Sequence, residues 1–323
     1  MNQSNWSAIE EKGTLLGMSL LFGIYRFFGR IPFMMVLYPV VLYYFLFSAS
    51  ARDASIFYLS RVKIMNGHLP AQSLYRLSFR HFLTFAEGLL DKLIAWMGAI
   101  NYEHVSFADQ SKFFDLMDRG QGAIIIGSHL GNLEVMHALS KYNKKIRLNI
   151  LVHTKHAEKF NRILRQAEPS SQLSLMQVSD ITPATALLMK DKVDAGEFIV
   201  IVGDRVPVAS PSARNRTSSV DFLGEPADFA QGPLLIAAIL KCPVYTLFCL
   251  KREKQYEIQF SWFSDRIKLN RTSREADLKA CIQQYANILQ EQTLRAPFQW
   301  FNFYPYWQSE QVDEPKPGAT LER

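Results

Sequence analysis

The chain has 323 residues, of which 48% are hydrophobic, 13% aromatic and 20% charged. Its net charge of +6 suits an anionic membrane surface or an acidic carrier protein. Nucleic acid is discounted as a partner, because the basic residues are dispersed and no nucleic-acid-binding motif is recognised. The three cysteines form no CxxC pair, so they indicate neither a zinc site nor a disulfide framework.

The first 52 residues are predicted to associate with a membrane. Ile31 to Ala51 contains no charged residue and is about as long as a helix that crosses a bilayer core. Pro39 should kink the middle of such a helix, so a bent, shallow or re-entrant segment is an alternative to a full span. A buried core helix is the other alternative.

Residues 53–119 are predicted to be mainly helical, because 54–64 and 73–97 carry long apolar faces. We expect this region to form a helical cap on a catalytic core at 120–307. The phenylalanines of the cap can line an acyl groove or belong to the ordinary core. Residues 308–323 form a polar tail.

An apolar run over 123–128 ends at His129, and Glu134 follows five residues later. Residues five apart on one helix point about 140° away from each other, so we expect a strand, a turn and then a helix capped by Asn132. A neutral imidazole at a strand end can remove a hydroxyl proton, and a nearby carboxylate fixes its tautomer. The alternative is that His129 only satisfies buried backbone and Glu134 is an ordinary first-turn carboxylate.

Strands and helices are predicted to alternate after His129, which is typical of a mixed or parallel sheet flanked by helices. Strands are expected at 147–153, 173–178 and 198–203, and helices at 156–167 and 184–195. The last strand delivers Asp204 and Arg205 to the same sheet edge as His129 if the strands run parallel. Arg205 can bind a phosphate or carboxylate of a substrate, or form a salt bridge with Asp204.

The remaining core is predicted from turns and aromatic residues. A polar loop over 207–220 is followed by a strand end and turn at 222–227, and Asp228 is expected to cap a helix that runs to Lys241. Paired strands are expected at 244–251 and 256–263, and a helix at 273–294. The aromatic cluster over 300–307 suits an interfacial membrane anchor, with core packing as the competing interpretation.

His129 and Glu134 match the HX4(D/E) motif of the glycerolipid and lysophospholipid acyltransferase superfamily, and their surroundings resemble its lipid A late-acyltransferase branch. The other matching segments follow in the family's order: Gly127-Ser128-His129, Gly131-Asn132, Gly203-Asp204-Arg205, 222–227 and Gly232-Pro233. The resemblance covers about residues 15–307.

The resemblance implies an α/β fold with a mixed, mostly parallel sheet flanked by helices. It implies O-acyl transfer from an acyl carrier protein thioester, or from acyl-CoA, to a hydroxyl of a lipid or glycolipid acceptor. It also implies location at the bacterial inner membrane, with the catalytic domain facing the cytoplasm. No metal or organic cofactor is required.

The implied residue roles divide into catalysis and binding. His129 is the expected general base and Glu134 its orienting partner, while backbone N–H groups of Gly131 and Asn132 are candidates to stabilise the oxyanion. The residues expected to bind substrate are Asn132, Asp204, Arg205, Gly224 and Glu225.

The sequence departs from family members that acylate lipid A. These usually carry Asp-Gln in place of Asp204-Arg205, an arginine near 153–156 and a more basic C-terminal region. The pattern resembles a divergent subgroup associated with specialised bacterial lipids such as aryl polyenes. Two alternative functions stay open: a thioesterase that uses the same residues on water, and a non-catalytic membrane adaptor.

Overall fold

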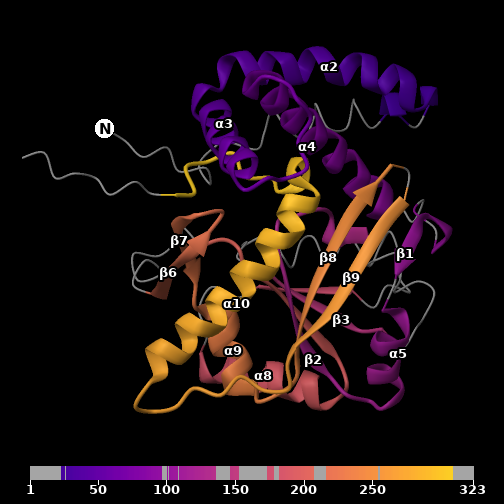
Figure 1. The fold of residues 1–323 in the computed structure, drawn as a ribbon. Helices are drawn as coiled ribbons and strands as arrows, with labels where there is room; N and C mark the ends of the chain where they lie inside the picture. Colours follow the sequence, from indigo (N-terminus) through magenta and orange to yellow (C-terminus); the bar gives the residue numbers. More distant parts are fainter. Residues whose placement is uncertain are drawn as a thin grey trace, which may run out of the picture.

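A mixed seven-stranded sheet forms the centre of the computed structural model (Figure 1). The structure describes residues 23–25, 27–96, 100, 102–107, 109–135, 146–152, 173–177, 182–206, 216–253 and 255–307. The helix predicted at 156–167 lies outside these residues, as do most of the predicted polar loop and the polar tail.

The strand order in the sheet is β1-β9-β8-β2-β5-β3-β4. The strands are β1 (Val105–Phe107), β2 (Ala123–Gly127), β3 (Leu148–Val152), β4 (Leu173–Gln177), β5 (Phe198–Val202), β8 (Val244–Arg252) and β9 (Gln255–Ser264). All neighbouring pairs are parallel except β8 with β9. The predicted mostly parallel sheet is therefore confirmed, and its buried central strand β2 is apolar throughout, as expected for a strand covered on both faces.

Helices cover the sheet and extend beyond one end of it (Figure 1). They are α2 (Arg30–Phe47), α3 (Ala49–Ile64), α4 (Leu74–Trp96), α5 (Gln110–Asp118), α8 (Pro183–Asp194), α9 (Gly232–Leu240) and α10 (Arg274–Arg295). The 3-10 turns are η2 (Tyr102–His104), η3 (Leu133–Val135) and η5 (Pro297–Gln299). The region predicted as a helical cap thus also contributes the edge strand β1, which pairs with β9.

The break in the N-terminal helical region lies at Ser48 and not at Pro39. Pro39 sits inside α2, whereas Ser48 has a non-helical backbone with φ −102° and ψ 72°. Arg52 stabilises this break by donating to the carbonyl oxygens of Phe45 at 2.9 Å and Leu46 at 3.1 Å, which the end of α2 leaves without helical partners.

No single helix in the described residues is both long and apolar enough to cross a membrane. The helices Ile31–Phe47 and Ala49–Ile64 meet that length and composition only as a pair, and they are bent by 93° at the break. The apolar segment over 31–51 is therefore divided between two helices of different direction, which agrees with the bent alternative to a straight span.

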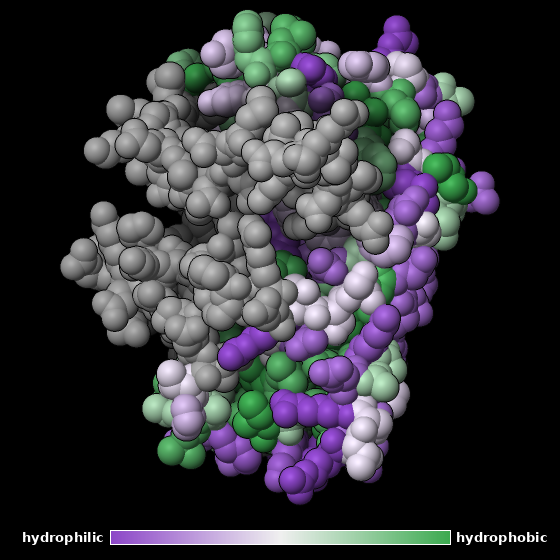
Figure 2. All heavy atoms as spheres, turned by 90° about the vertical axis from the view of Figure 1, so that its left-hand side faces the viewer, coloured by the Kyte–Doolittle hydropathy of each residue, from purple (hydrophilic) through white to green (hydrophobic). Residues whose placement is uncertain are grey.

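Helix α2 buries one narrow face and leaves the rest exposed. Phe33, Leu37, Val41 and Phe45, spaced four residues apart, pack with Phe82 and Leu90 of α4. Met34 is partly buried against the same cluster. The other large side chains of α2 are exposed although they are apolar or aromatic: Ile31, Met35, Val36, Tyr38, Val40, Leu42, Tyr43, Tyr44, Leu46 and Phe47. Figure 2 shows hydrophobic side chains at the top of the molecule, at the level of α2 in Figure 1.

A separate hairpin of β6 (Thr217–Phe222) and β7 (Glu225–Ala230) lies beside α10 (Figure 1). Its two-residue turn has φ 55° at Leu223 and 74° at Gly224, as a tight hairpin turn requires. The prediction that Asp228 caps a helix is wrong, because Asp228 pairs with Ser219 inside this hairpin. Helix α9 begins only at Gly232, directly before Pro233.

The C-terminal aromatic cluster belongs to the core. Trp300, Tyr306 and Trp307 are buried with Phe222 and Phe229 of the hairpin. The ring of Phe222 stacks on Trp307, with centroids 6.0 Å apart and an interplanar angle of 11°. Core packing, rather than a membrane anchor, is thus the role of these three rings, which fasten the C-terminal segment to the sheet.

Candidate active site

His129 and Asp204 meet at the carboxyl edge of the sheet. Strands β2 and β5 run parallel, with Gly127 opposite Val202. His129 lies two residues beyond the end of β2 and Asp204 two residues beyond the end of β5. The prediction that both residues reach the same edge of the sheet is therefore confirmed.

The Asp204 carboxylate accepts hydrogen bonds from both His129 and Trp300. Its Oδ1 lies 2.9 Å from His129 Nδ1, and the backbone N–H of His129 reaches Oδ1 at 3.1 Å and Oδ2 at 3.0 Å. Trp300 Nε1 donates to Oδ2 at 2.9 Å. The carboxylate side chain is 0% exposed, whereas the His129 side chain is 36% exposed. A buried carboxylate therefore contacts an imidazole that is partly exposed to solvent.

The charge of this pair follows from its surroundings. Burial alone would raise the pKa of the Asp204 carboxyl, but the charge and hydrogen bond of His129, the charge of Arg205 and the Trp300 hydrogen bond lower that pKa below its ordinary value. A carboxylate can only accept, so His129 Nδ1 carries the proton of the neutral ring. Nε2 is then the nitrogen with a lone pair, which is the form that a general base needs.

The turn after His129 is fixed by a close approach to β8. Gly131 has φ +78°, and a Cβ at this position would lie 2.0 Å from the carbonyl oxygen of Cys249. Only glycine fits there. The N–H of Gly131 donates to Gln299 O and the N–H of Asn132 donates to Cys249 O, both at 2.9 Å.

These hydrogen bonds change the interpretation of Gly131 and Asn132. Both were predicted as oxyanion donors, but their N–H groups are used to tie the turn to β8 and to the C-terminal segment. Asn132, also expected to contact substrate, has only 5% of its surface exposed. A helix was predicted to begin after Asn132. The described residues that follow Asn132 form the 3-10 turn Leu133–Val135.

Glu134 lies in that 3-10 turn, and its side chain is outside what the structure describes. The predicted orienting role would require the Glu134 carboxylate to accept a hydrogen bond from His129, and this role stays a prediction. Among the described side chains, Asp204, predicted as a substrate-binding residue, accepts the hydrogen bond from His129 Nδ1. The signal that could have identified Asp204 was its position at the end of a strand parallel to β2.

Arg205 is held by the C-terminal segment. Its Nη2 donates to Phe301 O at 2.6 Å, and its guanidinium carbon lies 5.5 Å from the centre of the Tyr304 ring. The predicted contact with a substrate phosphate or carboxylate stays a prediction. Beside Asp204, the positive charge of Arg205 also favours the ionised carboxylate.

Gly224 and Glu225 contact Arg61 of α3. Arg61 Nη2 donates to the carbonyl oxygens of Leu223 at 3.1 Å and Gly224 at 2.9 Å, and Nη1 pairs with Glu225 Oε1 at 2.9 Å. The turn of the hairpin is thereby clamped to the helical cap. The predicted role of these two residues in binding an acceptor is untested, and their described contacts are structural.

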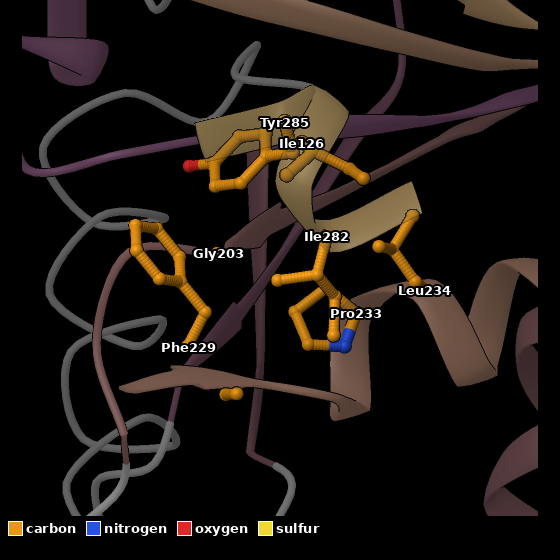
Figure 3. A pocket seen from close by; sticks show the side chains of 8 residues that line it. Ile126, Gly203, Phe229, Pro233, Leu234, Ile282 and Tyr285 are labelled. Atoms are coloured by element: carbon orange, nitrogen blue, oxygen red, sulfur yellow. The ribbon is translucent and has the colours of Figure 1, made fainter. Parts of the chain in front are cut away.

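A small apolar cavity is lined in part by residues that precede the pair in the sequence (Figure 3). Its lining includes Ile126 of β2 and Gly203, which directly precedes Asp204, while Figure 3 shows the rings of Phe229 and Tyr285 on either side of Gly203. The cavity measures about 10 Å³, which is about the space of one water molecule. It cannot hold an acyl chain in this conformation.

Within the described part of the chain, no group of three or more His, Cys, Asp or Glu side chains could hold a metal ion. The groups that the site brings together are the partly exposed imidazole of His129 and the buried carboxylate of Asp204. Such a pair can move a proton from a hydroxyl group to a leaving group.

Residues 91–309 match the profile of the family described as bacterial lipid A biosynthesis acyltransferase. The matched range contains the whole seven-stranded sheet, His129, Asp204 and Trp300. A comparison with curated proteins found no match.

Proposed function

The chain belongs to the bacterial lipid A biosynthesis acyltransferase family, and on this premise we propose that it moves a fatty acyl group from a thioester donor to a lipid hydroxyl. Family membership implies an acyl donor and a lipid acceptor. An acyl carrier protein is the preferred donor and acyl-CoA the alternative, because the net charge of +6 suits an acidic carrier. The hydrogen bond between His129 and buried Asp204 is the observation that carries the proposal.

In the proposed reaction, His129 Nε2 removes the proton of the acceptor hydroxyl as its oxygen attacks the thioester carbonyl. The C–O bond forms and a tetrahedral oxyanion results. When this intermediate collapses, the C–S bond breaks and the proton on Nε2 passes to the departing thiolate. The products are an acylated lipid and a free thiol, and His129 returns to its neutral form.

Asp204 supports both proton transfers. Its carboxylate holds Nδ1–H of His129 and thus fixes the tautomer whose Nε2 accepts a proton. When His129 becomes an imidazolium, the buried negative charge lies 2.9 Å from the positive ring. In serine proteases, replacing the corresponding aspartate by asparagine lowers kcat by about 10⁴-fold.

The proposal includes a membrane-contacting role for α2. This family is associated with the inner membrane. The exposed side chains of α2 are predominantly apolar or aromatic, and its Phe33, Leu37, Val41 and Phe45 face packs on α4. A helix fastened along one side and apolar on the other suits insertion into the surface layer of a bilayer.

The proposal is tested with the full chain in membranes and labelled acyl carrier protein thioester or acyl-CoA. Mass spectrometry measures labelled lipid and labelled free fatty acid. We expect labelled lipid with the wild type, none with His129→Ala, and a loss of 10³-fold or more with Asp204→Asn. Label found only as free fatty acid would support hydrolysis instead, and equal lipid labelling by wild type and His129→Ala would refute the proposal.

Asp204→Asn and Glu134→Gln, compared with each other, separate the motif-based mechanism from the one proposed here. If Asp204 orients His129, Asp204→Asn should lower kcat without preventing donor binding, whatever the effect of Glu134→Gln. If Asp204→Asn retains full activity while Glu134→Gln is inactive, the orienting role belongs to Glu134. Isosteric amides are used in both variants so that shape is kept and only charge is lost.

A further inference from the structure

We propose that Trp300 is a positioning residue for acyl transfer, whose indole N–H holds the Asp204 carboxylate in the orientation that directs Oδ1 at His129. This inference rests on the proposed function and adds a residue to its machinery. Trp300 lies 96 positions after Asp204 in the sequence, and its Nε1 donates to Oδ2 at 2.9 Å.

The two carboxylate oxygens of Asp204 have different side-chain partners. Oδ1 lies 2.9 Å from His129 Nδ1, and Oδ2 accepts from Trp300; the His129 backbone N–H reaches both. The terminal torsion of an aspartate is broad and roughly two-fold, so a carboxylate held from one side can turn. The indole donor on the other side restricts that rotation and keeps Oδ1 in place.

Indole chemistry suits a positioning role. The Nε1–H group of tryptophan is a donor only. At Asp204 it therefore stabilises the ionised carboxylate, and it is not a proton carrier for the reaction. Any effect of Trp300 on transfer must act through the carboxylate and the base that the carboxylate orients.

The indole ring is itself fixed by its neighbours. Trp300 is 1% exposed, and its ring centre lies 5.0 Å from Tyr58, 5.2 Å from Phe222 and 5.0 Å from Tyr306. All three contacts have edge-to-face geometry, an arrangement that aromatic pairs prefer. The donor therefore has one position available in the packed core.

The backbone of Trp300 is fastened on both sides of the site. Its carbonyl oxygen accepts from His81 Nε2 of α4 at 3.0 Å. The backbone of Trp300 also forms an isolated antiparallel bridge with that of Leu130, the residue next to His129. The same residue thus borders the base through its backbone and the carboxylate through its side chain.

The test compares Trp300→Phe with Trp307→Phe. Trp307 is 9% exposed, lies in the same aromatic cluster and donates its indole N–H to Phe222 O at 3.1 Å. Both variants remove the same atoms and one buried hydrogen bond, but only Trp300→Phe removes a donor from Asp204. The matched pair therefore separates positioning from loss of core packing.

Steady-state transfer of labelled acyl groups gives the deciding readout. We expect Trp300→Phe to lower kcat by about 10- to 100-fold, the effect of losing a hydrogen bond to a charged group, with the KM values of both substrates within about twofold of wild type. Trp307→Phe should retain kcat within about twofold. Equal kcat values for the two variants, measured where both are folded, would overturn the proposal.

A second variant keeps the experiment decisive if Trp300→Phe does not fold. Incorporation of β-(3-benzothienyl)alanine at position 300 keeps the bicyclic shape and replaces N–H by sulfur. The same fall in kcat is expected, and an unchanged kcat would refute the role of the donor. Failure of the proposed function looks different, because the wild type itself would then form no more labelled lipid than His129→Ala.

Discussion

His81 should make the protein sensitive to mild acid, because this histidine is buried in a neutral form. It lies on α4 with 0% exposure. Its Nε2 is 3.0 Å from Trp300 O, which can only accept, so Nε2 carries the proton. Nδ1 then accepts from Ser55 Oγ at 2.9 Å, and Ser55 Oγ in turn accepts from Ser78 at 2.9 Å.

The size of the effect follows from the shifted pKa. Burial lowers the pKa of His81 from 6.5 to about 3, and the hydrogen bond to Trp300 offsets only part of that change. Below pH 6.5 the unfolded chain binds a proton at His81 that the folded chain does not bind. The free energy of unfolding is therefore unaffected by His81 well above pH 6.5, the pKa of this residue in the unfolded chain. Below that pH it falls by about 1.4 kcal/mol per pH unit. At pH 5.0 the expected loss is about 2 kcal/mol.

Urea unfolding in detergent at pH 7.5 and pH 5.0 measures this loss. His81→Gln is the comparison, since glutamine can donate to Trp300 O and accept from Ser55 but does not titrate. The two proteins differ only at position 81, so the difference between their losses isolates His81. The free energy of unfolding of the wild type should fall by about 2 kcal/mol more than that of the variant. Equal losses in the two proteins would refute the reasoning.

Three further predictions concern the turn after β2, the hairpin clamp and the membrane face. Gly131→Ala should abolish transfer and destabilise the fold by about 2 kcal/mol or more, since its Cβ would lie 2.0 Å from a carbonyl oxygen of β8; retained activity would contradict this. In urea titrations Arg61→Met should lower the free energy of unfolding by roughly 1–3 kcal/mol. Glu225→Gln, at a half-exposed position, should lower it by under about 1 kcal/mol, and a larger loss for Glu225→Gln than for Arg61→Met would contradict the role given to the Arg61 hydrogen bonds. Met35→Glu should weaken co-sedimentation with anionic phospholipid vesicles by about tenfold or more, while the exposed Leu187→Glu on α8 should not.

The sheet could be predicted because its signals are local. A short run of β-branched residues such as 124–126, with glycines on both sides, is typical of a buried strand. Alternation of such runs with helical patterns then indicates parallel pairing. The structure places β2, β3, β4, β5, β8 and β9 within a residue or two of the predicted strands.

The partner of His129 could not be derived from spacing, because it is set by sheet register. Glu134 is five positions from His129 in the sequence, whereas Asp204 is 75 positions away. Only the pairing of Gly127 with Val202 brings Asp204 beside the imidazole. The local motif predicts His129 and Glu134 as a pair, which stays a prediction, and the long-range contact places the Asp204 carboxylate beside His129.

Two other departures have local physical causes. A turn within 222–227 was predicted, but the pairing of β6 with β7 across it was not. The first turn residue, Leu223, has φ 55°, which is unusual for a residue with a branched side chain, so the sequence does not carry the usual signal of a two-residue hairpin turn. Pro39 lies on the exposed side of α2, between Leu37 and Val41, whose packing on α4 keeps the helix continuous. The chain bends instead where Ser48 leaves helical geometry and Arg52 binds the last carbonyl groups.

The aromatic C-terminal segment connects the helical cap to the catalytic edge of the sheet. Trp300 receives a hydrogen bond from His81 of the cap through its carbonyl group and gives one to Asp204 through its ring. Asp204 in turn holds His129. A buried carboxylate is costly unless each oxygen has a donor, and these donors come from segments that only the complete fold brings together. The geometry around His129 is therefore set by the cap, the sheet and the C-terminal segment together, which explains why no single motif in the sequence contains it.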